Sequence, residues 1–177
     1  MAESEMSSNR SALQIIREAV LCDSSKIQRV SADNKLDWQD PFVLAAVAKK
    51  LIQVCEEKNI PYLHAIMFGI NLDLFVMKSE QTHKVYLNCQ YAKTGESGPC
   101  IEHNYYEYRK DGKYKSYFTT RSYSVAVVGL EIINLNNPEI KELEIQADGQ
   151  EAIIIQQAVD LQNFTYLEDL GVEVETF

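Results

Sequence analysis

Tyrosine and basic side chains are concentrated in residues 104–121, where five Lys or Arg accompany two acids. Flat aromatic faces can stack on nucleic acid bases while positive charge binds phosphate. Tyr and Arg also dominate the energetics of protein–protein interfaces. We therefore treat one face of this stretch as the candidate binding site. Its members are Tyr106, Tyr108, Lys113, Lys115, Tyr117 and Arg121.

The two β-rich runs in this stretch are separated by Asp111-Gly112. This dipeptide predicts a hairpin with a two-residue loop, because Gly adopts positive φ without steric penalty. In that register Tyr106 faces Tyr117, and Glu102 faces Arg121. These cross-strand pairs would stabilise the hairpin even without any binding role.

The predicted hairpin has two different faces, because side chains alternate along a strand. The candidate binding residues share one face, which we expect to be exposed to water. The other face carries Tyr105 and Phe118 and is expected to pack on the rest of the chain. Three interpretations stay open for the exposed face: a protein interface, a nucleic-acid or nucleotide site, or a solvated sheet without a ligand.

A second set of residues has ligand types that zinc accepts, namely His83, Cys89, Cys100 and His103. On an extended strand, however, Cys100 and His103 point to opposite faces. Neither pair is flanked by the glycines of a tight knuckle. We therefore predict no metal site and no cofactor, and interpret these residues as buried thiols and polar strand histidines.

Nucleophilic catalysis would need Cys89 or Cys100 held beside an imidazole from His64, His83 or His103. Nothing in the sequence establishes such a contact. The chain has no Gly-x-Ser-x-Gly, no His-Glu-x-x-His and no phosphate-binding loop. The sequence therefore favours a protein that is not an enzyme, although a Cys/His enzyme remains an alternative.

Two helices are predicted ahead of these strands. Residues 11–22 place apolar side chains on one helical stripe. Asp40 is a good N-cap, and Pro41 suits the first helical position because its missing N–H is not needed there. Apolar residues then recur at helical spacing until Asn59 and Pro61 end the segment. This second helix is expected to lie across a sheet.

The apolar period then changes to two, which predicts strands. The predicted strands cover residues 62–70, 72–77, 83–91, 101–110 and 113–128. Their short connections require antiparallel neighbours and therefore a meander. Further on, we expect a strand at 140–146, a helix at 150–163 and a strand at 172–174; a second hairpin is the alternative for 150–163.

These elements predict an α+β fold: N-terminal helices packed on a five- to six-stranded, mainly antiparallel meander sheet, closed by an acidic C-terminal helix and strand segment. Residues 1–9 are predicted to be a disordered tail and residues 10–177 a single domain. The net charge is −9, and residues 139–177 hold ten acids and one Lys. That acidic third either keeps the protein soluble or binds a basic partner.

The composition, 46% hydrophobic and 24% charged, is that of a globular protein, and no window approaches 18 apolar residues. Together with the polar, acidic N-terminal residues, this composition predicts a cytoplasmic protein without membrane contact. Its cysteines are then expected to be reduced. We predict a non-enzymatic protein-binding module (adaptor, chaperone or inhibitor-like), a homodimer, that uses the tyrosine and lysine face or the acidic third. The alternative is nucleic-acid or nucleotide binding through the same face, which the overall acidity disfavours.

Overall fold

The computed structural model describes residues 40–68, 70, 72–108 and 113–175, with only the backbone for residues 106–108. The predicted tail at 1–9, the predicted helix at 11–22 and the Asp111-Gly112 loop lie outside the described residues.

The first described helix is α2, Pro41–Lys58, and it begins and ends as the sequence predicts. The Asp40 carboxylate accepts a hydrogen bond from the Phe42 N–H at 2.9 Å, which satisfies a donor that has no partner within the helix. Asn59 ends the helix in the left-handed conformation at φ 51°. The apolar stripe predicted for this helix is buried, with Leu44 and Val47 at its centre.

Within the described residues, eight strands form two antiparallel sheets. The larger sheet has the order β1-β2-β3-β6-β7, with strands Tyr62–His64, Leu74–Ser79, Thr82–Lys93, Ser124–Ile133 and Glu139–Asp148. The smaller sheet has the order β4-β5-β8, with strands Ser97–Tyr108, Tyr114–Ser122 and Val172–Val174. The predicted α+β class is confirmed, but the single meander is wrong, because β3 pairs with β6 and the β4–β5 hairpin belongs to another sheet.

Two predicted strands are divided by the structure. The run at 113–128 breaks at Tyr123, whose N–H donates to the Glu96 carbonyl at 2.9 Å, and β5 and β6 on either side join different sheets. In the described residues of the run at 62–70, the short β1 is followed by a 3-10 turn, η3, Ala65–Phe68. There the Ile66 N–H donates to His64 Nδ1 at 3.1 Å, so the local side chain takes a bond that a strand would give to its neighbour.

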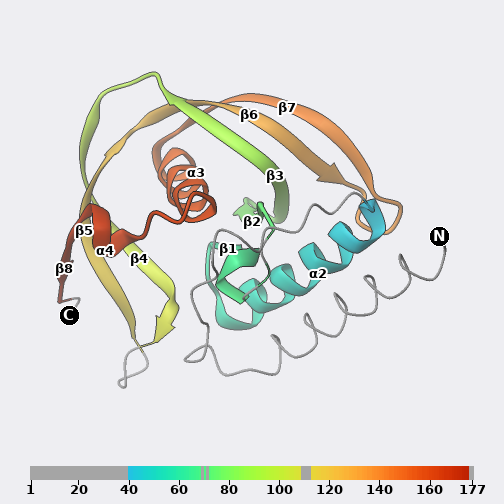
Figure 1. Cartoon of the computed structure of the whole chain (residues 1–177), viewed down its shortest axis with the longest axis horizontal. Coiled ribbons are helices and arrows are strands. Elements are labelled where there is room, and N and C mark those ends of the chain that lie inside the picture. The colour runs from blue at the N-terminus through green and yellow to red at the C-terminus, as the bar shows by residue number, and fades with distance from the viewer. Residues whose placement is uncertain (1–39, 69, 71, 109–112, 176–177) are drawn as a thin grey trace.

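The helix that positions the candidate site is α3, Gly149–Gln162, which confirms the helix predicted at 150–163. It packs against β1, β3, β5, β6 and β7, whereas α2 packs against β1 and β2. Figure 1 shows α3 beneath the arch of β3, β6 and β7, with β1 and β2 between it and α2. A short helix, α4, Leu167–Leu170, leads into β8. Of the helices in the described ranges, none has both the length and the apolar character needed to cross a membrane.

Candidate functional site

The β4–β5 hairpin pairs in a different register from the one that its loop predicts. Glu102 lies opposite Tyr117 rather than Arg121, and the ladder is irregular between Asn104 and Tyr108. Extra residues in β4 are accommodated there as a bulge. Because the shift along β5 is even, Glu102 and Arg121 still point to the same face of the sheet.

This shared face is buried at Tyr117 and Arg121, where water exposure was expected, and Phe118 on the other face is exposed. Tyr105 packs against Tyr62 of the core as expected. Tyr117 is 4% exposed and Arg121 is 5% exposed, whereas Phe118 on the opposite face is 49% exposed. The physical reason is helix α3, which packs on β5 and brings the carboxylate of Asp160 to Arg121. The prediction of a wet binding face is therefore wrong at these positions.

The structure describes the side chains of four of the six predicted binding residues. Lys113 is exposed and Lys115 is half-buried, while the side chains of Tyr106 and Tyr108 lie outside the description. The structure groups Arg121 with acids instead of with the lysines. A binding role for these six residues stays a prediction.

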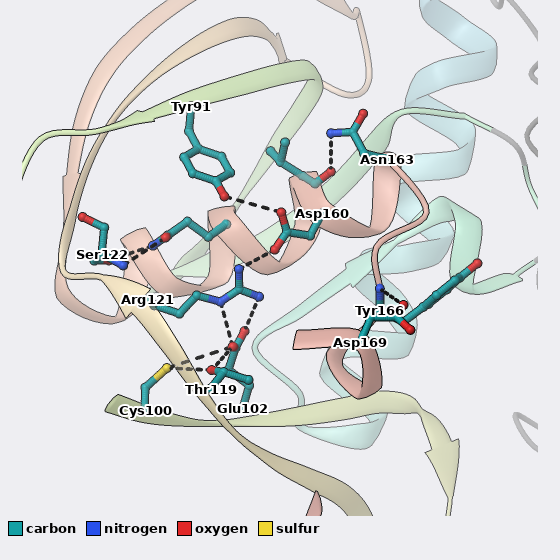
Figure 2. Close-up of polar contacts among 12 residues, drawn as sticks. Tyr91, Cys100, Glu102, Thr119, Arg121, Ser122, Asp160, Asn163, Tyr166 and Asp169 are labelled. Carbon is teal, nitrogen blue, oxygen red and sulfur yellow. Dashed lines mark hydrogen bonds and ion pairs between the residues drawn. The ribbon is translucent and has the colours of Figure 1, made fainter. Parts of the chain in front are cut away.

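Arg121 is the centre of a buried charge network that joins β4, β5 and α3 (Figure 2). Its Nε donates to Glu102 Oε2 at 2.7 Å and its Nη2 to Glu102 Oε1 at 3.1 Å, which is the bidentate geometry that suits a guanidinium. Its Nη1 donates to Asp160 Oδ2, and the hydroxyl of Thr119 donates to Glu102 Oε2. We call Glu102, Arg121 and Asp160 the charge network.

The network holds one positive and two negative formal charges in a nearly dry place. Side-chain exposure is 5% for Arg121, 1% for Glu102 and 18% for Asp160. Burial acts to lower the pKa of Arg121, but the hydrogen bonds and charges of both carboxylates outweigh it and raise that pKa above its ordinary value. Arg121 therefore stays charged at any physiological pH.

Two further side chains lie at the border of the network (Figure 2). The hydroxyl of Tyr91 donates to Asp160 Oδ1 at 3.4 Å, and Cys100 Sγ lies 3.1 Å from Thr119 Oγ1. Burial, and then the charge of Asp160, raises the pKa of Tyr91. Burial likewise raises the pKa of Cys100, so its thiol is protonated at neutral pH and is a weak nucleophile.

Buried glutamines of α3 fix the helix to both sheets. Gln156, fully buried, donates to the Ser122 carbonyl at 2.7 Å and accepts from the Ser122 N–H at 3.1 Å. Gln157 donates to the His103 carbonyl at 3.0 Å, and Gln162 to the Cys89 carbonyl at 2.8 Å. Sequence reasoning missed these residues and Asp160. The available signal was polar side chains on a helix that is apolar almost all round.

The histidines and cysteines proposed for zinc or catalysis are distributed over different strands and make other contacts. His83 and Cys89 lie on β3, and Cys100 and His103 on β4. His103 Nδ1 is 2.8 Å from Ser116 Oγ, whereas Cys100 contacts Thr119, so these two residues do not form a catalytic pair. In the part of the chain that the structure describes, no group of three or more His, Cys, Asp or Glu is placed to hold a metal ion.

No model of a known protein family matches the sequence, and no similar sequence was found among curated proteins. Solved structures of peptide deformylases are similar in fold. The enzyme from Thermotoga maritima has a TM-score of 0.65 at 17% identity, over 85% of this chain and 92% of that one. That from Legionella pneumophila has a TM-score of 0.63 at 18% identity, over 86% and 83%. That from Synechococcus elongatus, in complex with actinonin, has a TM-score of 0.65 at 20% identity, over 85% and 75%.

At these identities the likeness establishes an α+β fold shared with peptide deformylases. These structural neighbours are enzymes. They contradict the predicted non-enzymatic, homodimeric protein-binding module. They likewise contradict its alternative, a protein that binds nucleic acid. The fault lay in taking a missing sequence motif together with uneven charge as a sign of binding.

Proposed function

We propose that this protein is an enzyme that acts on peptides, with the charge network as its reaction centre. The observation that carries the proposal is the likeness to peptide deformylases over more than four fifths of the chain. The network adds a second argument, because ionisable groups held together in a desolvated place are typical of catalytic sites. It lies where α3 crosses the β4–β5 hairpin (Figure 2).

The proposed chemistry is hydrolysis of an amide bond by acid–base groups. Asp160 is the most accessible member of the network and would take a proton from the attacking water. The water oxygen would bond to the carbonyl carbon, and Arg121 would stabilise the negative charge on the carbonyl oxygen. The proton would then pass from Asp160 to the departing amine as the amide bond breaks. Glu102 would act as a positioning residue by holding the guanidinium on two hydrogen bonds.

The test is a panel of short peptides of one sequence with a formylated, an acetylated or a free N-terminus. Product masses and release of primary amine are measured for the natural protein and for Asp160→Asn. We expect turnover of at least one peptide and a loss of about a hundredfold or more in the variant, since a general base contributes about that much. Glu144→Gln, on the exposed face of β7, is the matched control and should keep full activity.

Two results would reject the proposal. One is unchanged masses for every peptide at high protein concentration. The other is full activity in Asp160→Asn when its thermal midpoint shows that the variant is folded.

The cytoplasm is the proposed location of this activity. The free thiols of the three described cysteines, Cys55, Cys89 and Cys100, support a reducing compartment.

A further inference from the structure

The outer face of the smaller sheet carries a row of exposed apolar side chains. Ile101 pairs directly with Phe118, and Phe118 pairs directly with Val172, so the three residues stand side by side across β4, β5 and β8. They are 55%, 49% and 71% exposed, in that order. Neighbouring strands are about 4.8 Å apart, so the apolar row is about 10 Å long. Single exposed apolar residues are ordinary, but a contiguous group is typical of a binding surface.

The third position of the apolar row depends on a close backbone approach. A Cβ on Gly171 would lie 2.4 Å from the Phe118 carbonyl oxygen and 2.7 Å from Thr119 Cγ2. Only glycine therefore lets the chain come this near to β5 before it enters β8. The Gly171 N–H is held by the Leu167 carbonyl at 2.9 Å. The chain is thus tied down where it places Val172 beside Phe118.

The side of the apolar row that α4 and β8 form is acidic. Residues 167–175, which form α4 and β8, contain four acids and no Lys or Arg. Asp169, Glu173 and Glu175 are exposed. Glu173 adjoins Val172 along β8, an edge strand, although it points to the opposite face. On the side toward the hairpin loop, the next row across the strands begins with the polar pair His103–Ser116. An apolar side chain flanked by positive charge would therefore be complementary to this surface.

The apolar row lies directly behind the charge network. Ile101 is followed on β4 by Glu102, and Phe118 is followed on β5 by Thr119. Since successive side chains point to opposite faces, the same two strands carry the apolar row outside and the network inside. A ligand on the outer face would therefore contact the strands that hold the proposed reaction centre without covering it.

We propose that the apolar row is a docking site for the peptide substrate, remote from the reacting bond, and that it selects segments with a large apolar side chain beside Lys or Arg. This inference rests on the proposed function, because it names the class of peptide that the enzyme would take. The acidic segment 167–175 favours a peptide that carries Lys or Arg over a second copy of the chain, because the second copy has the same net negative charge.

The test uses three fluorescein-labelled peptides of equal length with alternating Leu and Lys, Leu and Glu, or Ser and Lys. Their binding to the full chain is measured by fluorescence anisotropy. We expect only the Leu and Lys peptide to bind, and we expect Phe118→Thr to raise its Kd about tenfold, since threonine keeps the strand but removes the ring. Val128→Thr is the matched control, because Val128 is 52% exposed on β6 of the other sheet.

Three outcomes would overturn the inference. They are equal binding of the Leu and Glu or Ser and Lys peptide, an equal loss in Val128→Thr, and a dimer in light scattering that Phe118→Thr dissociates. Glu102→Gln separates this proposal from the preceding one. It should abolish turnover yet leave anisotropy with the Leu and Lys peptide unchanged. If no peptide is turned over but Phe118→Thr still weakens binding, the proposed function fails and the docking site stands.

Discussion

Removing the guanidinium from the charge network should destabilise the protein strongly. In Arg121→Met, Glu102 loses both of its hydrogen bonds to Arg121 while its side chain is only 1% exposed. An uncompensated buried charge of this kind costs about 3–5 kcal/mol in the free energy of unfolding. For a chain of this length each kcal/mol shifts the thermal midpoint by about 2–4 °C, so we expect a fall of about 6–20 °C.

The assay is urea unfolding followed by circular dichroism, at pH 8 and at pH 5. A desolvated carboxylate without a cation has a raised pKa, so lowering the pH favours protonation, which removes the buried charge. A group whose folded pKa is raised stabilises the fold at low pH and loses that contribution as the pH rises. Arg121→Met should therefore recover part of its lost stability at the lower pH.

A double variant isolates the interaction. Glu102→Leu together with Arg121→Met removes both charges, and replacement of a buried ion pair by apolar residues is often close to neutral. We therefore expect the double variant to be more stable than Arg121→Met alone, which is a clear coupling between the two sites. The reasoning is refuted if Arg121→Met unfolds within about 1 kcal/mol of the natural protein, because Glu102 would then not need its partner.

Three further predictions concern close packing, buried thiols and the helix attachment. Gly129→Ala should lower the free energy of unfolding in urea by about 1–3 kcal/mol, because the added Cβ would lie 2.7 Å from Cys89 Sγ and 2.9 Å from Cys89 Cα. Gly149→Ala is the control: no atom lies within 4 Å of its added Cβ, so it should cost only the strain of φ 59°. Burial raises the pKa of Cys89 to about 11. The contribution of this thiol to the free energy of unfolding should therefore be complete below pH 9 and fall by about 1.4 kcal/mol per pH unit from pH 9 to 11. Cys89→Ala should reduce that slope. Gln156→Leu should cost about 1–3 kcal/mol, because the Ser122 N–H and carbonyl lose the buried amide that they contact, and exchange of the Ser122 amide hydrogen should accelerate.

The sequence by itself determined the local elements whose signals are complete within a few residues. Asp40, Pro41 and Asn59 delimit α2 because the cap, the first position and the left-handed end are each satisfied locally. The spacing of the hairpin residues likewise determined that Glu102 and Arg121 share a face, which holds for any even register.

Only the tertiary structure decided which hairpin face is buried and what the buried residues contact. Both faces carry aromatic side chains, so their periodicity does not rank them, and the loop sequence carried no sign of the bulge after Asn104. Burial of Arg121 became favourable because Asp160, 39 residues further along the chain, arrives on α3 to complete its ion pairs. The prediction of a single meander sheet was wrong because it, too, depended on contacts between distant parts of the chain. The choice between β5 and β3 as the partner of β6 is made by long-range packing, which a local pattern does not contain.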